Sequence, residues 1–176
     1  MTSDIEICDL FTIHNPRESL LPVLISAIRN PPTDEVAMDE ITEVLAAILS
    51  YRNQPSQGYC VVAKQPGSQV LLGVMTLKPP DKIIRGFARS ENPIELTDAY
   101  VLTRRTGIGR ALVAHMENKA RADGHTEIVL VSGPRFRWSG WPFWRRLYGR
   151  PVGIAERYFN DAEGEYDGSV WRKPLK

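Results

Sequence analysis

The chain has 176 residues, of which 43% are hydrophobic and 24% charged, a composition typical of one globular domain. The apolar content excludes a disordered chain, the lack of a glycine period excludes collagen, and two cysteines are too few for a disulfide scaffold. The net charge of +1 argues against nucleic acid as an obvious partner. We therefore expect one domain spanning residues 1–176.

No apolar run in the sequence reaches the length of a membrane span. The N-terminus has neither the basic flank nor the apolar stretch of a signal peptide. A cytoplasmic protein without a membrane partner is the expectation. Cys8 and Cys60 are then expected to be free, buried thiols.

Charge is distributed unevenly along the chain. Residues 1–100 hold 8 Lys and Arg against 13 Asp and Glu, a balance of −5, whereas residues 101–176 hold 14 against 8, a balance of +6. The C-terminal part is therefore expected to face an anion, unless the asymmetry only reflects a solvated surface.

The first elements follow from the spacing of apolar residues. An alternating stretch from Ile5 to Thr12 predicts a strand, and apolar residues at helical spacing predict two helices over 19–29 and 39–52. Runs rich in β-branched residues predict strands over 59–64 and 69–78. A Pro-Gly turn between these two strands indicates a hairpin.

The middle of the chain begins with a segment rich in proline and glycine. Residues 79–93 are predicted to be a surface loop of the kind that often touches substrate. A strand over 94–102, a helix over 109–122 ended by Gly124, and a strand over 127–131 are predicted after it.

The C-terminal part is predicted to hold a short aromatic helix over 142–148 and two weaker strands over 154–159 and 169–173. The element order is then β-α-α-β-β-β-α-β-α-β-β. This order predicts an α/β (α+β) fold, in which helices flank a central sheet.

The segment most informative about function is Arg104-x-x-Gly107-x-Gly109, which joins a predicted strand to a predicted helix. The first amides of a helix lack intrahelical partners and lie at the positive end of its dipole, so they bind anions. Arg104, Arg105 and Arg110 add charge suited to phosphate oxygens. The segment therefore predicts a site for a pyrophosphate.

Two other phosphate-binding motifs do not fit this segment. A dinucleotide fingerprint needs a third glycine where Leu112 stands, and a P-loop needs Gly-Lys-Ser/Thr. The plainer alternative is a tight turn in which the glycines only relieve strain.

The same segment resembles the signature of the GNAT acyltransferase superfamily, Gln/Arg-x-x-Gly-x-Gly/Ala after the fourth strand. The predicted element order also resembles that family's fold, whose central sheet is mixed and mostly antiparallel. The resemblance implies an N-acyltransferase that transfers acetyl from acetyl-CoA, its co-substrate, to a primary amine by direct attack. It also implies that acetyl-CoA contacts the following residues: Tyr100, Val101, Arg104, Arg105, Thr106, Gly107, Ile108, Gly109, Arg110 and Ala111.

The sequence departs from the family pattern in the aromatic segment. Trp144 stands where the family often has the tyrosine that protonates the leaving thiolate, and an indole cannot supply that proton. Tyr148, one turn later on the predicted helix, is the nearest phenol. Tyr148 and water are thus the two candidate acids.

Two carboxylates precede the motif and are candidate bases. An amine acceptor is almost wholly protonated at neutral pH, so a base or a water chain is needed. Glu95 and Asp98 lie three residues apart on one predicted strand, hence on opposite faces, so at most one is expected to enter a cleft. Asp98 is the first choice because it adjoins the expected binding segment.

The remaining polar residues indicate no further chemistry. His14, His115 and His125 are expected to be structural, and no Cys/His/Asp spacing indicates a metal site. Residues 128–155 contain five arginines among aromatic residues and no acid. This stretch is interpreted as packing plus CoA contact, with single-stranded RNA binding as an alternative.

The leading functional hypothesis is an acetyl-CoA-dependent N-acetyltransferase, a monomer or homodimer, acting on a small-molecule or peptide amine. A catalytically silent domain that binds acyl-CoA or a partner is the alternative, because Trp144 replaces the expected tyrosine.

Overall fold

A computed structural model describes residues 5–28, 34–161 and 164–176. The chain forms two compact units, one of Met1–Lys78 and Asp98–Asn118 and one of Pro79–Thr97 and Lys119–Lys176. Strand β4 and helix α4 each run from one unit into the other.

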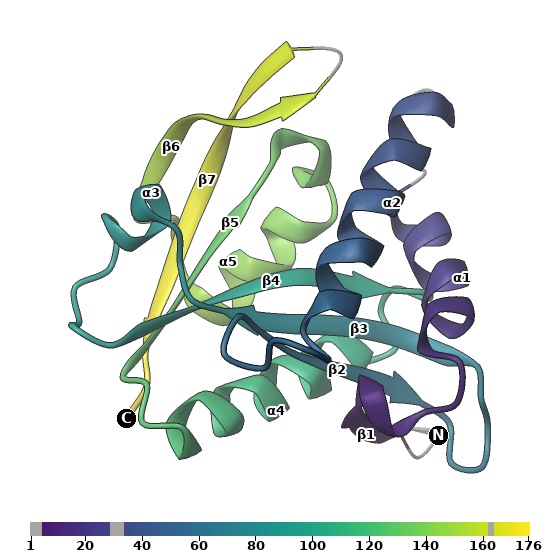
Figure 1. Ribbon diagram of the computed structural model, residues 1–176. Coiled ribbons are helices and arrows are strands. Elements are labelled where there is room, and N and C mark those ends of the chain that lie inside the picture. The colour runs from purple at the N-terminus through teal and green to yellow at the C-terminus, as the bar shows by residue number, and fades with distance from the viewer. Residues whose placement is uncertain (1–4, 29–33, 162–163) are drawn as a thin grey trace. The chain divides into compact units, whose positions relative to one another are not determined.

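Figure 1 labels the helices and strands. In chain order they are β1 (Glu6–Asp9), the 3-10 turn η1 (Leu10–Thr12), α1 (Pro16–Ile28), α2 (Asp34–Ser50), β2 (Tyr59–Lys64), β3 (Leu71–Lys78), α3 (Lys82–Arg85), β4 (Pro93–Val101), α4 (Ile108–Ala122), β5 (Glu127–Ser132), the 3-10 turn η2 (Pro134–Phe136), α5 (Gly140–Tyr148), β6 (Gly153–Asp161) and β7 (Gly164–Pro174).

The strands follow the order β1-β2-β3-β4-β5-β7-β6. The pairs β1/β2, β2/β3, β5/β7 and β6/β7 are antiparallel, whereas β4 and β5 are parallel. The predicted fold class, a mixed and mostly antiparallel sheet with flanking helices, is therefore confirmed.

Two predicted elements differ from the structure because an aspartate caps a helix. The strand predicted over Ile5–Thr12 ends at Asp9, whose side chain accepts a hydrogen bond of 2.8 Å from the amide of Phe11 and starts η1. The loop predicted over 79–93 contains α3, because Asp81 accepts hydrogen bonds from the amides of Ile83 and Ile84. Asp and Asn in such positions favour a helix start over an extended chain.

Other predicted boundaries differ by a few residues. Helix α1 begins at Pro16 rather than Ser19, because proline suits the first turn of a helix. Arg29, its predicted last residue, lies outside the described residues. The Pro-Gly turn of the hairpin is confirmed: Gly67 has φ +75°, and the amide of Ser68 donates to the carbonyl of Gln65.

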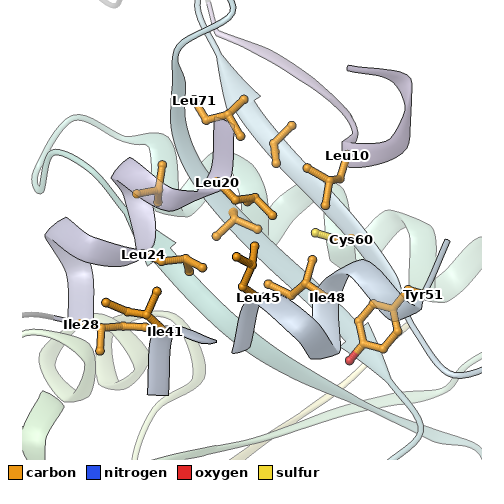
Figure 2. Close-up of a cluster of buried hydrophobic side chains, with 13 residues drawn as sticks. Leu10, Leu20, Leu24, Ile28, Ile41, Leu45, Ile48, Tyr51, Cys60 and Leu71 are labelled. Atoms are coloured by element: carbon orange, nitrogen blue, oxygen red, sulfur yellow. The ribbon is translucent and has the colours of Figure 1, made fainter. Parts of the chain in front are cut away.

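The core of the first unit lies between α1, α2 and one face of β2 and β3. Figure 2 shows Leu20 and Leu24 of α1, Leu45 and Ile48 of α2, and Cys60 of β2 in one buried cluster. Burial of each such aliphatic side chain contributes roughly 1.5–3 kcal/mol. Cys60 is buried as predicted, whereas Cys8 is only half-buried, so that expectation was wrong for Cys8; both thiols are free.

The second unit has a smaller apolar cluster where α3 packs on its strands. Ile84 of α3 is buried with Val129 of β5, Ala155 of β6 and Val170 of β7. On α5, the Trp144 ring is 5% exposed, and Trp171 of β7 is fully buried with its indole N–H donating to the carbonyl of Gly149. This hydrogen bond joins β7 to the residue that follows α5.

Candidate active site

The turn between β4 and α4 is a backbone cradle in the first unit. Arg105 and Gly107 both adopt the left-handed conformation, with φ of +64° and +86°. The hydroxyl of Thr106 donates a 3.0 Å hydrogen bond to the carbonyl of Thr103 and holds the turn closed. Glycine at 107 meets the positive φ without the penalty that a Cβ brings.

The N-terminus of α4 is arranged to receive an anion. The amide of Ala111 donates to the carbonyl of Gly107 at 3.1 Å, so the amides of residues 108–110 precede the first helical hydrogen bond. The first turn contains no acidic residue. Arg104, Arg105 and Arg110 are exposed around this end of the 15-residue helix. The helix dipole and these three charges together favour phosphate oxygens.

Gly73 of β3 lies directly against the first turn of α4. A Cβ at Gly73 would lie 3.0 Å from the Leu112 side chain, 3.0 Å from the Tyr100 carbonyl oxygen and 3.1 Å from the Ile108 side chain. Ile108 and Leu112 are both buried. The missing side chain at 73 thus lets α4 approach β3 closely, which sets where the cradle lies relative to Tyr100.

The end of β4 supplies the other expected contacts of the co-substrate. Tyr100 and Val101 are half-buried, and Ala99 between Asp98 and Tyr100 is exposed. The chain leaves the strand at Leu102, whose amide donates a 2.8 Å hydrogen bond to the carbonyl of Leu72 on β3. The structure thus places Tyr100 and Val101 beside the cradle in the same unit.

Asp98 breaks the regular alternation of β4. Its φ is +49°, in the left-handed region, although the residue lies inside a strand. The expectation that Glu95 and Asp98 face opposite sides of the sheet assumes an unbroken pleat, and the strand does not have one at this position. The Oδ2 atom of Asp98 accepts a 2.6 Å hydrogen bond from the hydroxyl of Thr76, a fully buried residue of β3.

The pKa of Asp98 is raised above its ordinary value. Burial is the main cause, and the Glu40 carboxylate adds to the increase. The hydrogen bond from Thr76 and the charge of Lys78 oppose it by favouring the ionised form. A carboxylate with a raised pKa is a stronger base than an exposed one, as proton abstraction from an ammonium requires.

Glu95 belongs to the second unit. It is 1% exposed and pairs with Val129 where β4 runs parallel to β5. Its charge contributes, after burial, to raising the pKa of Tyr158, whose hydroxyl donates a 2.5 Å hydrogen bond to Asp81. Glu95 is thus a buried carboxylate whose charge acts on the half-buried Tyr158.

Tyr148 also lies in the second unit, at the end of α5. Its ring packs at 5.7 Å from the ring of Trp144, and the ammonium of Lys173 lies 5.1 Å from the Tyr148 ring centre. The hydroxyl oxygen of Tyr148 is buried. The Arg and aromatic stretch before it includes Trp138, which is 82% exposed with the Arg137 guanidinium 4.9 Å from its ring.

The predicted site residues are thus divided between the units. The first unit contains the whole cradle together with Asp98, Tyr100 and Val101. Glu95 and Tyr148 lie in the second unit. Sequence reasoning missed Thr76 and Gly73, since their contacts with Asp98, Tyr100 and Leu112 are distant along the chain and leave no local signal.

Within the described ranges, no group of three or more His, Cys, Asp and Glu side chains could hold a metal ion. The described helices include none with the length and apolar character needed to cross a membrane. His125 has a structural contact, its Nδ1 lying 3.2 Å from the Asn92 side-chain oxygen.

One comparison with known proteins shows the family of the chain. The family model described as "Acetyltransferase (GNAT) family" matches residues 24–147. No curated protein matches the sequence.

Three solved structures illustrate the similarity of fold. An N-acetyltransferase from Staphylococcus aureus Mu50 has a TM-score of 0.64 at 17% identity, covering 99% of this chain and 100% of that one. PaiA N-acetyltransferase from Thermoplasma acidophilum, solved in complex with coenzyme A, has a TM-score of 0.62 at 16% identity, with coverage of 97% and 99%. The ribosomal-protein-S18-alanine N-acetyltransferase from Escherichia coli has a TM-score of 0.63 at 14% identity, with coverage of 98% and 95%.

Proposed function

The chain belongs to the GNAT acetyltransferase family, and we propose that it transfers an acetyl group from acetyl-CoA to a primary amine by direct attack. The observation that carries the proposal is the cradle at the start of α4, with Gly107 at φ +86° and no acid in the first helical turn. Amides and arginines in this arrangement suit a pyrophosphate.

The residues present fit the co-substrate. The amides of residues 105–110 and the exposed Arg104, Arg105 and Arg110 would hold its phosphates. The backbone of Tyr100 and Val101 would hold the pantetheine arm. Acetyl-CoA supplies the acetyl group as a thioester, and the PaiA structure with bound coenzyme A has the same fold.

Asp98 is proposed as the base. The acceptor arrives as an ammonium ion, with an ordinary pKa near 10.4, and the Asp98 carboxylate takes a proton from it before the nitrogen attacks the thioester carbon. The bond from carbon to sulfur then breaks, the nitrogen releases its second proton to solvent to give the neutral amide, and the thiolate takes a proton. Tyr148 and water remain the two candidate sources of that proton.

The acidic character around Asp98 suits a cationic acceptor. Glu40 on α2 adds to the burial that raises the pKa of Asp98, although Lys78 on β3 opposes it, and Asp39 and Glu43 are exposed on the same helix α2. An amine that is protonated in solution is attracted to such a surface. Small-molecule amines and peptide amines are the acceptor classes proposed.

The test is a panel of primary amines with acetyl-CoA, read by thiol release and by the mass of the acetylated product. We expect at least one amine to gain the mass of an acetyl group in place of a hydrogen. Asp98→Asn should lower kcat by about 10²–10⁴, as loss of a general base does. Acetyl-CoA binding without acetylation of any amine would contradict the enzyme and support the silent binding domain.

A further inference from the structure

Asp98 holds an unfavourable backbone conformation inside a strand. A left-handed φ of +49° on a residue other than glycine is unfavourable and persists only where surrounding contacts enforce it. Aspartate tolerates this region better than most residues. Contacts within the first unit must therefore hold Asp98, and the hydrogen bond from Thr76 to its side chain is such a contact.

Thr76 is a buried hydroxyl among apolar neighbours. It is 0% exposed on β3, between Met75 and Leu77, and it pairs with Cys60 on β2. A buried hydroxyl is costly unless it is hydrogen-bonded. Its 2.6 Å bond to the Asp98 Oδ2 atom satisfies it, and a valine of the same shape would pack there without a polar group.

The bond joins β3 to the left-handed position of β4. Cys60 and Thr76 face the same side of the sheet, since they are register partners. Cys60 belongs to the core under α1 and α2. The Thr76 hydroxyl therefore lies on the side of the sheet that α2 covers, where Glu40 also acts on Asp98.

We propose that Thr76 is a positioning residue: its hydroxyl fixes the Asp98 carboxylate through Oδ2 and leaves Oδ1 to take the proton of the acceptor amine. The inference rests on the proposed function, in which Asp98 is the base. It assigns to β3 a role that neither the family motif nor the cradle supplies.

The groups around Asp98 determine in which direction its pKa moves when the Thr76 hydroxyl is removed. Lys78 on β3 and the Thr76 hydroxyl favour the ionised carboxylate, whereas burial and Glu40 on α2 disfavour it. The Cys60 thiol on β2 faces the same carboxylate, and its own pKa is raised by burial and then by Asp98 and Asp9. Removing the hydroxyl therefore raises the pKa of Asp98 further.

The test measures the Asp98 carboxyl directly, by ¹³C NMR titration of aspartate-labelled protein, with Asp98→Asn to assign the signal. We expect Thr76→Val to move the titration midpoint up by roughly one pH unit or more, as loss of a hydrogen bond to a charged group implies. Thr76→Ser, which keeps the hydroxyl, should leave the midpoint near that of the wild type. Thr76→Ala provides a second hydroxyl-free variant if the valine variant does not fold.

The second readout is the pH dependence of kcat/KM with acetyl-CoA and an amine from the panel. The acidic limb should move to higher pH in Thr76→Val by the same amount as the NMR midpoint, and not in Thr76→Ser, while acetyl-CoA affinity stays unchanged. A variant that only loosened the fold would lower activity without moving the limb.

An unchanged NMR midpoint in Thr76→Val would overturn the inference. A moved midpoint with an unmoved acidic limb would also overturn it, since Thr76 would then act on a carboxyl that is not the base. If no amine in the panel is acetylated, the proposed function fails, and the NMR titration still decides whether Thr76 governs the carboxyl.

Discussion

Replacing Gly73 by alanine tests whether the contact of β3 with α4 shapes the cradle. The new Cβ would lie 3.0 Å from the Tyr100 carbonyl oxygen and from the Leu112 side chain, and 3.1 Å from Ile108. Side chains can move by a few tenths of an ångström, but the carbonyl oxygen belongs to the backbone of β4. Overpacking of this kind costs about 1–3 kcal/mol.

The strain has two expected consequences. The free energy of unfolding, measured by urea denaturation, should fall by about 1–3 kcal/mol. Coenzyme A affinity, measured by calorimetry, should fall as well, because α4 carries the cradle amides and must move away from Tyr100. Each kcal/mol of strain felt at the site corresponds to about a fivefold loss of affinity.

Leu112→Ala supplies the matched control, because it removes one of the three contacts of the new Cβ. In a double-mutant cycle the cost of Gly73→Ala should be smaller on the Leu112→Ala background. If Gly73→Ala leaves both the unfolding free energy and the coenzyme A affinity at wild-type values, the close approach of α4 to β3 does not set the cradle.

Three further predictions concern single residues. Asp98→Asn should raise the free energy of unfolding at neutral pH. The pKa of Asp98 is higher in the folded protein than in the unfolded chain, so the wild type loses stability as pH rises between the two pKa values, and the neutral amide removes that loss. Equal or lower stability of the variant in denaturation series at several pH values would contradict this. Tyr148→Phe should lower kcat by about 10²–10⁴ with acetyl-CoA affinity intact if its hydroxyl protonates the thiolate, and an unchanged kcat would assign that proton to water. Leu24→Ala, at a fully buried site in the first unit, should destabilise the protein by about 2–5 kcal/mol, and a loss well below that range in urea denaturation would show that the cluster in Figure 2 is not closely packed.

The sequence predicted the elements whose signals are local. The strand over 59–64, the Pro-Gly hairpin and the glycine turn before α4 all follow from neighbouring residues, and the structure contains each of them. The aspartate caps at Asp9 and Asp81 carried a local signal too, but the strand and loop patterns around them masked it.

The geometry of the candidate site could not be predicted in the same way. The left-handed φ of Asp98 is enforced by contacts from other strands, and a pattern of alternation cannot reveal it. The hydrogen bond from Thr76 to Asp98 spans 22 residues of sequence, and the close contact at Gly73 depends on side chains of α4. Burial of the Tyr148 hydroxyl likewise depends on packing around Trp144 and Lys173.

Whether the cradle binds the co-substrate is tested by calorimetric titration of acetyl-CoA into the wild type, Gly109→Glu and Ala114→Glu. Gly109 is the second residue of α4, within the cradle, whereas Ala114 is exposed further along the same helix and receives the same charge. We expect wild type and Ala114→Glu to bind alike, and Gly109→Glu to lose binding because a bulky anion would occupy the phosphate position. Equal affinity of all three proteins for acetyl-CoA would contradict the assignment of the cradle.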